Sequence, residues 1–80
     1  MAVVIYVKEG CPFCQKVINF LEENQKENVE IYVADKDFKK SDFKEKYGED
    51  ATFPRGYLVN GKKIKLIGGS DKIISYLETH

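Results

Sequence analysis

The first apolar run of the chain, residues 2–7, is continuous rather than alternating. Its residues A-V-V-I-Y-V are β-branched or aromatic after the first, which is typical of a strand covered on both faces of a sheet. The period then changes, because Phe13 and Val17 begin a series of apolar positions that falls on one helical face. Pro12 suits the first helical position, where its missing N–H would have no acceptor. Because the residue before a proline is pushed out of helical geometry, we expect Cys11 to cap this helix.

A second strand and a short helix follow. Residues 29–34 read V-E-I-Y-V-A and predict a strand. A helical crossover between two strands so close in sequence makes them parallel. The next helix carries Phe43 on its apolar face, with Asp37 or Ser41 as its cap and Gly48 as its end.

Two further strands form a hairpin. Residues 57–59 and 62–67 flank Asn60 and Gly61, a pair typical of tight hairpin turns because both turn positions need positive φ. Three lysines lie in this hairpin: Lys62, Lys63 and Lys65. We expect them to protect an edge strand from pairing with other chains.

A last helix begins at Ser70, which we expect to cap it, with Asp71 in the first turn where a carboxylate favours the helix dipole. The element order is therefore β-α-β-α-β-β-α. This order predicts an α/β fold in which helices flank a four-stranded mixed sheet. No repeat or linker interrupts the 80 residues, so we expect residues 1–80 to form a single domain.

Composition narrows the function. Lysine plus arginine total 13 and aspartate plus glutamate total 13, so the formal net charge is zero. Nucleic-acid-binding proteins need a basic excess, and we expect no nucleic-acid partner. No apolar run approaches the ~20 residues of a membrane span, and the N-terminal stretch lacks the basic region of a signal peptide. We therefore expect no membrane association and a cytoplasmic location, where thiols are kept reduced.

The two cysteines, Cys11 and Cys14, form a C-x-x-C motif at the predicted strand-to-helix junction. A disulfide between them closes too short a loop to stabilise the fold much. In a β-α-β unit this motif is typical of thioredoxin-like redox chemistry. The free N–H groups at the helix N-terminus favour a thiolate at Cys11, and Lys8 adds a positive charge. We expect Cys11 to be the exposed nucleophile and Cys14, one turn further on, to be the resolving thiol.

Two other interpretations of the cysteines remain. A zinc site needs four ligands, and the other candidate ligand in the sequence is His80, so we expect no metal. The cysteines also fit an unreactive role in the core, since free cysteine is often buried.

Three short motifs, in this order along the chain, resemble the glutaredoxin family of the thioredoxin fold. They are Cys11-Pro12-Phe13-Cys14, Thr52-Phe53-Pro54 and Gly68-Gly69-Ser70-Asp71. The resemblance covers nearly the whole chain. It implies a cis peptide bond before Pro54, facing the cysteines, with the backbone of Phe53 open to a substrate peptide.

The resemblance also implies glutathione as the reducing co-substrate, with no bound cofactor, and glutathionylated or disulfide-containing proteins as partners. Glutathione carries two carboxylates and one ammonium group. Lys8 and Lys40 fall where the family holds the glycine carboxylate. The backbone N–H groups of Ser70 and Asp71 would bind the γ-glutamyl carboxylate, with the Asp71 side chain on the ammonium group.

The chain departs from the family's pattern near this site. Phe13 stands where a tyrosine is common, and it keeps the ring that we count among the glutathione-binding residues. Arg55 and Gly56 stand where family members often have a polar or basic residue and then an aliphatic one, and Gly56 weakens the start of a strand. The following hairpin is also longer than usual.

Three functions are compatible with these residues. The leading one is a monomeric dithiol glutaredoxin, in which Cys11 attacks a disulfide and glutathione or Cys14 then releases it. The second is a thioredoxin-like reductase that a flavoprotein recharges. The third is an iron–sulfur carrier dimer with Cys11 and glutathione as ligands, which Pro12 disfavours because such family members tend to lack that proline.

Overall fold

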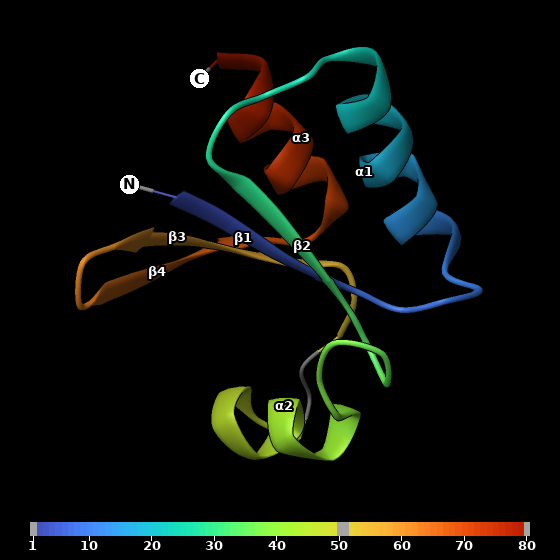
Figure 1. The fold of residues 1–80 in the computed structure, drawn as a ribbon, viewed down its shortest axis with the longest axis vertical. Helices are drawn as coiled ribbons and strands as arrows, with labels where there is room; N and C mark the ends of the chain where they lie inside the picture. The colour runs from blue at the N-terminus through green and yellow to red at the C-terminus, as the bar shows by residue number, and fades with distance from the viewer. Residues whose placement is uncertain (1, 50–51, 80) are drawn as a thin grey trace.

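The computed structural model describes residues 2–49 and 52–79. A four-stranded sheet forms the middle layer; α1 and α3 cover one face, and α2 lies on the other (Figure 1). The order of elements and the α/β thioredoxin fold predicted from the sequence are confirmed. The elements are β1 (Ala2–Val7), α1 (Pro12–Glu23), β2 (Val29–Val33), α2 (Lys40–Tyr47), β3 (Arg55–Asn60), β4 (Lys63–Gly68) and α3 (Ser70–Thr79).

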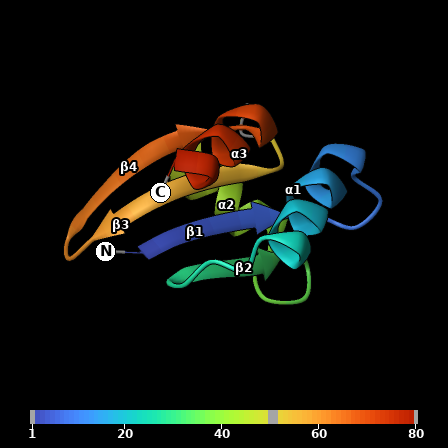
Figure 2. The same ribbon diagram turned by 90° about the horizontal axis from the view of Figure 1, so that it is seen from above.

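The strands lie in the order β2-β1-β3-β4, as Figure 2 shows from above. β1 pairs in parallel with β2 and antiparallel with β3, and β3 pairs antiparallel with β4. β1 is therefore a central strand, and Val4 and Ile5, which point to opposite faces, are both buried. This burial on both faces explains the unbroken apolar run at the start of the sequence.

The main core lies between the sheet and the α1–α3 pair. Ile5 of β1, Val17 of α1 and Ile73 of α3 are fully buried there. Both cysteines belong to the same cluster of buried residues. The C-x-x-C turn, residues 11–14, is therefore fixed to the main core. Among the described helices, none is both long enough and apolar enough to cross a membrane.

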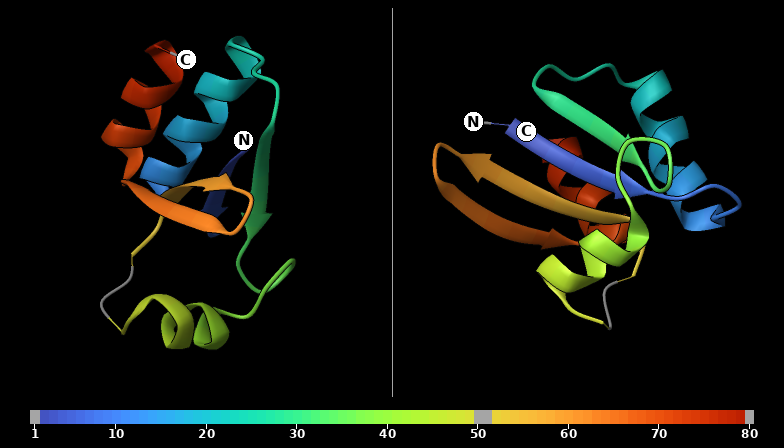
Figure 3. Two further views of the ribbon diagram at one scale, coloured as in Figure 1. Left: turned by 90° about the vertical axis from the view of Figure 1, so that its left-hand side faces the viewer. Right: turned by 60° about the horizontal axis from the view of Figure 1, so that its bottom comes forward.

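The other face of the sheet carries an aromatic layer, which consists of Tyr6, Phe38, Phe43, Tyr47, Phe53 and Tyr57. The backbone of α2 stands off from the sheet (Figure 3). The rings of the aromatic layer pack against one another between α2 and the sheet. Tyr47 stacks on Tyr57 at 4.5 Å between ring centroids, and Phe43 lies 4.9 Å from both Tyr6 and Phe53. Burial raises the pKa of the Tyr6 hydroxyl, and its hydrogen bond with Tyr47 raises it further.

The hairpin turn differs by one residue from the prediction. Asn60 is the last residue of β3 and pairs with Lys63, so the two-residue turn is Gly61 and Lys62. Gly61 has φ of 62°, whereas Asn60 is not among the residues with positive φ. A glycine at the first turn position with positive φ matches the II′ type of hairpin turn, which places the left-handed residue after Asn60.

The predicted caps of two helices are wrong. Lys39 precedes α2 without a side-chain cap, whereas the Asp37 carboxylate accepts a 2.8 Å hydrogen bond from the Val33 N–H, and Ser41 lies within the helix. The Asp37 side chain therefore stabilises the short loop after β2 and does not cap α2. Ser70 is the first residue of α3 rather than its cap, because the Gly69 carbonyl accepts the helical hydrogen bond from the Ile73 N–H.

Candidate functional site

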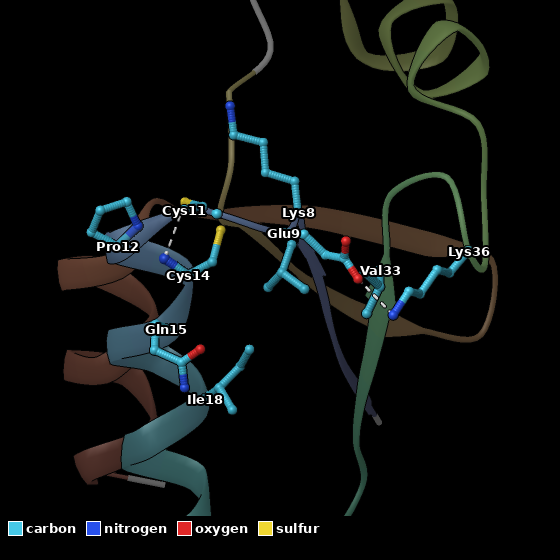
Figure 4. Close-up of a pocket in the computed structure, with 11 residues that line it drawn as sticks. Lys8, Glu9, Cys11, Pro12, Cys14, Gln15, Ile18, Val33 and Lys36 are labelled. Atoms are coloured by element: carbon cyan, nitrogen blue, oxygen red, sulfur yellow. Dashed lines mark hydrogen bonds and ion pairs between the residues drawn. The ribbon is translucent and has the colours of Figure 1, made fainter.

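The two cysteines lie where β1 leads into α1. Cys11 has the extended backbone of a helix cap, and Pro12 is the first helical residue, as the sequence predicts. The Cys14 N–H donates a hydrogen bond to Cys11 Sγ over 3.2 Å, drawn as a dashed line in Figure 4. The Cys11 thiol also lies 3.7 Å from the Phe53 carbonyl oxygen, to which it donates. Both cysteines are free thiols.

The two cysteines differ less in solvent exposure than the sequence predicts. Cys11 is not exposed as expected, since only 9% of its surface is accessible, although Cys14 is lower still at 1%. Cys11 packs into the core because the helix cap points its side chain back over the first turn. Burial and the hydrogen bond with Cys11 raise the pKa of the Cys14 thiol to about 12. Cys14 therefore keeps its proton at neutral pH.

The loop before β3 brings Phe53 against the cysteines. The Phe53–Pro54 peptide bond is cis, as the family resemblance implies. The ring of Phe53 packs on Phe43 of α2, and its carbonyl oxygen faces Cys11. The aromatic layer thus contacts the C-x-x-C turn through Phe53.

A cavity of about 530 Å³ opens beside Cys11. Its lining includes Phe13, residues of the loops before α1 and before β3, and three lysines, with no carboxylate among the described lining residues. The lining residues are Lys8, Gly10, Cys11, Pro12, Phe13, Lys40, Lys44, Thr52 and Phe53. An anion that binds here would lie beside the sulfur atom, and we call this space the cationic cavity.

The three lysines come from two different parts of the chain. Lys8 follows β1, whereas Lys40 and Lys44 lie one turn apart on α2. Lys40 Nζ lies 3.6 Å from Asp35 Oδ2, so part of its charge is already balanced. Lys8 and Lys44 form no ion pair within residues 2–49 and 52–79. Lys44 was not identified from the sequence as a candidate site residue, although its i+4 spacing from Lys40 places both on one helical face.

A second cavity, of about 470 Å³, lies on the Cys14 side of the turn (Figure 4). Ile18 and Val33 supply an apolar wall, and Glu9 and Lys36 form a 2.6 Å ion pair across its mouth. Lys36 holds the pKa of Glu9 below its usual value through this hydrogen bond. In Figure 4 the Lys8 side chain points away from this ion pair. Lys8 lines both cavities, so the second cavity has two lysines and one carboxylate among its described lining residues, whereas the cationic cavity has three lysines and no carboxylate.

Three predicted glutathione-binding residues do not line the cationic cavity: Pro54, Ser70 and Asp71. Asp71 Oδ1 instead lies 3.4 Å from Lys16 Nζ of α1, with the Asp71 side chain 88% exposed. The start of α3 still lies close to the loop before β3, since a Cβ added at Gly69 would be 4.0 Å from the Pro54 carbonyl oxygen.

The metal-site interpretation depends partly on His80, which lies outside the described residues. Within the described part of the chain, no group of three or more histidine, cysteine, aspartate or glutamate side chains is placed to hold a metal ion.

Comparison with known proteins decides the family. The sequence model of the glutaredoxin family matches residues 3–64, from β1 to the beginning of β4. This chain belongs to the glutaredoxin family. The glutaredoxin is therefore a thiol–disulfide oxidoreductase, and its C-x-x-C motif lies within the matched residues. The Gly68–Asp71 motif lies beyond the match.

A solved structure, described as "Structure of a malarial protein", is similar to the glutaredoxin over 100% of this chain and 98% of that chain, with a TM-score of 0.54. At 14% sequence identity, this similarity supports the fold alone. No curated protein matches the chain.

Proposed function

We propose that this glutaredoxin uses glutathione to reduce glutathione mixed disulfides and protein disulfides, with Cys11 as the nucleophile and Cys14 as the resolving thiol. The observation that carries this proposal is the cationic cavity, which places Lys8, Lys40 and Lys44 around Cys11. Glutathione carries one carboxylate at each end of the tripeptide, and the lysines favour its glycine carboxylate, so they favour glutathione over a neutral thiol.

On a glutathionylated protein, the Cys11 thiolate attacks the glutathione sulfur, and the disulfide bond breaks to release the protein thiolate. The Cys14 N–H stabilises negative charge on Cys11 Sγ before the attack, since a charged acceptor strengthens the hydrogen bond. A second glutathione thiolate then attacks the bound glutathione sulfur. This step releases glutathione disulfide and restores the Cys11 thiolate.

On a protein disulfide, attack by Cys11 leaves the substrate covalently bound and frees its first thiol. Cys14 then attacks Cys11 Sγ, which lies within the same helical turn, and the second substrate thiol leaves. The raised pKa of Cys14 means that it loses its proton only as the attack proceeds, and the leaving thiolate takes up a proton from solvent or from Cys14. Two glutathione molecules reduce the resulting Cys11–Cys14 disulfide and become glutathione disulfide.

Glutathione binds with its glycine carboxylate among the lysines of the cationic cavity, beside the rings of Phe13 and Phe53. Its γ-glutamyl end extends past Pro54 to the N-terminus of α3, where the N–H groups of Ser70 and Asp71 bind the carboxylate. The exposed Asp71 side chain exchanges Lys16 for the ammonium group of glutathione, at little cost because exposed ion pairs are weak.

The test is turnover of a glutathione mixed disulfide in the presence of glutathione and its reductase. The Cys14→Ser variant retains turnover because this route uses one protein thiol, and the Cys11→Ser variant loses it. A parallel assay with a flavoprotein thioredoxin reductase in place of glutathione tests the alternative reductant. Turnover only with the flavoprotein, or full turnover by Cys11→Ser, would overturn the proposal.

A lysine pair on α2 tests the binding mode. Lys44 lines the cationic cavity, whereas Lys46 lies over the Tyr47 ring at 5.2 Å and does not line it. We expect Lys44→Gln to raise the KM for a glutathione mixed disulfide about fivefold, which corresponds to one exposed charge contact of about 1 kcal/mol. Lys46→Gln is the matched control, with the same charge change and an unchanged KM. Equal effects of the two variants would show that only the overall charge matters.

A further inference from the structure

Strand β4 is an edge strand with an unusual surface. It pairs with β3 on one side, and no described strand pairs with its other side (Figure 2). Ile64 is 51% exposed and Leu66 is 53% exposed, and both lie on this strand. With Phe13, they make up the large apolar side chains that are exposed in the described chain. Lysines alone are enough to protect an edge strand, so protection does not account for this apolar pair.

The register separates the side chains of β4 between the two faces of the sheet. Leu66 pairs with Tyr57 of the aromatic layer, so Leu66 and Ile64 point to the α2 face, where α2 leaves them uncovered. Lys65 pairs with Leu58, which packs against the main core, so Lys65 and Lys63 point to the opposite face. The strand therefore presents an apolar row on one face and a basic row on the other.

The backbone of the same strand is suited to pairing. In an antiparallel ladder, alternate residues of an edge strand point their N–H and C=O groups away from the partner. The pair that flanks a two-residue turn is hydrogen-bonded in such hairpins, and here it is Asn60 with Lys63. Counting from this pair, Ile64 and Leu66 point their backbone groups outward. The exposed apolar side chains and the outward backbone groups thus belong to the same residues.

The charge of the hairpin defines the partner. Residues 52–70 contain four basic residues and no aspartate or glutamate. Lys63 and Lys65 form no ion pair with any described residue. A second copy that paired through its own β4 would bring lysine opposite lysine, which is unfavourable.

We propose that the outer edge of β4 binds an extended acidic segment of a partner protein by strand addition. The segment carries acidic side chains opposite Lys63 and Lys65 and apolar side chains beside Ile64 and Leu66. Backbone hydrogen bonds supply affinity, and the alternating side chains select the segment. This binding is independent of glutathione and of the proposed reduction chemistry.

The probe is a short capped peptide of alternating glutamate and valine, titrated into the wild-type protein. We expect amide chemical-shift changes along β4 and slower amide exchange at Ile64 and Leu66. A peptide of alternating lysine and valine is the control and does not bind. Shift changes at Lys8, Lys40 and Lys44 instead of β4, or no changes, would overturn the proposal. Concentration-dependent self-association through β4 without peptide would also overturn it, because the occupant would then be a second copy.

Two sets of variants test the mode of binding. Ile64→Pro removes an outward N–H without removing a hydrogen bond to β3, and we expect it to weaken peptide binding about tenfold. Ile64→Val is the matched control and binds like the wild type. The double variant Lys63→Glu, Lys65→Glu leaves the backbone unchanged and switches the preference to the lysine peptide. This charge-reversed variant decides the question if Ile64→Pro does not fold.

The proposed reduction chemistry is followed separately in each variant. Turnover of a glutathione mixed disulfide stays at the wild-type level, because β4 does not line the cationic cavity. If the wild type does not bind the peptide but has normal turnover, only the proposal for β4 is contradicted. If the wild type has no turnover with glutathione, only the proposed glutathione chemistry is contradicted.

Discussion

Replacing Gly56 by alanine tests how closely α3 approaches the sheet. A Cβ at Gly56 would lie 2.7 Å from Ile73 Cγ1 and 3.1 Å from Ile73 Cδ1. Ile73 is fully buried, and a β-branched side chain in a helix has one strongly preferred χ1 rotamer, so it has little room to move. The φ of Gly56 is not in the left-handed region, so the substitution is a test of space rather than of backbone conformation.

Two effects of opposite sign set the size of the change. Overpacking a filled core costs about 1–3 kcal/mol. Alanine lowers the conformational entropy of the unfolded chain relative to glycine, which raises the free energy of unfolding by about 0.4–1 kcal/mol. The steric effect therefore dominates, and we expect Gly56→Ala to lower the free energy of unfolding by about 1–2 kcal/mol. For a domain of this size, the midpoint of thermal unfolding falls by about 4–8 °C per kcal/mol.

The assay is urea unfolding of a double-mutant cycle with Ile73→Ala, which removes both atoms that clash. Ile73→Ala alone costs about 2–5 kcal/mol. In its background, Gly56→Ala places a methyl group in the vacated space and should cost nothing further. The coupling energy between the two sites is then at least about 1 kcal/mol. Additive effects, or a Gly56→Ala variant as stable as the wild type, would refute the close approach.

The remaining predictions concern the thiols and Asp71. Alkylation at pH 7 should modify Cys11 and spare Cys14, whose thiol is buried and has a pKa of about 12, and peptide mapping by mass spectrometry checks this. The unfolded chain loses the Cys14 proton near its ordinary pKa of 9.0, so the folded protein binds more protons between about pH 9 and pH 12. The free energy of unfolding therefore falls with pH in that range, and Cys14→Ala should lose this part of the dependence. Asp71→Ala should raise the KM for glutathione and leave the urea midpoint nearly unchanged, because the exposed Lys16 pair contributes only about 0–1 kcal/mol; a lowered midpoint with an unchanged KM would assign Asp71 a purely structural role.

Local patterns in the sequence were sufficient to predict the helix that starts at Pro12 and the strand that precedes it, since one proline and one apolar run specify both. The same local patterns were sufficient to place the C-x-x-C motif at the junction between this strand and this helix. The turn at Gly61 was displaced by one residue because the Asn60-Gly61 pair is compatible with two turn positions, and the pairing of β3 with β4 selects between them.

Features that depend on contacts between distant segments were not predictable in this way. The burial of Cys11 depends on its packing with residues of several elements, and Asp71 lies beside Lys16 because α1 and α3 pack side by side. The glycine at position 56 indicated only a weak strand start from the sequence. The structure shows its reason, which is the side chain of Ile73 on a helix that follows later in the chain.

The aromatic layer determines how the lysines of α2 are held relative to Cys11. Cys11 is anchored in the main core, whereas Lys40 and Lys44 are carried by α2, which rests on rings. Phe53 connects the two, with its ring in the layer and its carbonyl oxygen against Cys11. The proposed nucleophile Cys11 and the two lysines of α2 are therefore held by different packed layers, and the rings between α2 and the sheet set the distance between them. We therefore expect exchanges among the aromatic residues other than Phe53 to change the position of Lys40 and Lys44, and with it the anions that fit, more than they change the packing of Cys11.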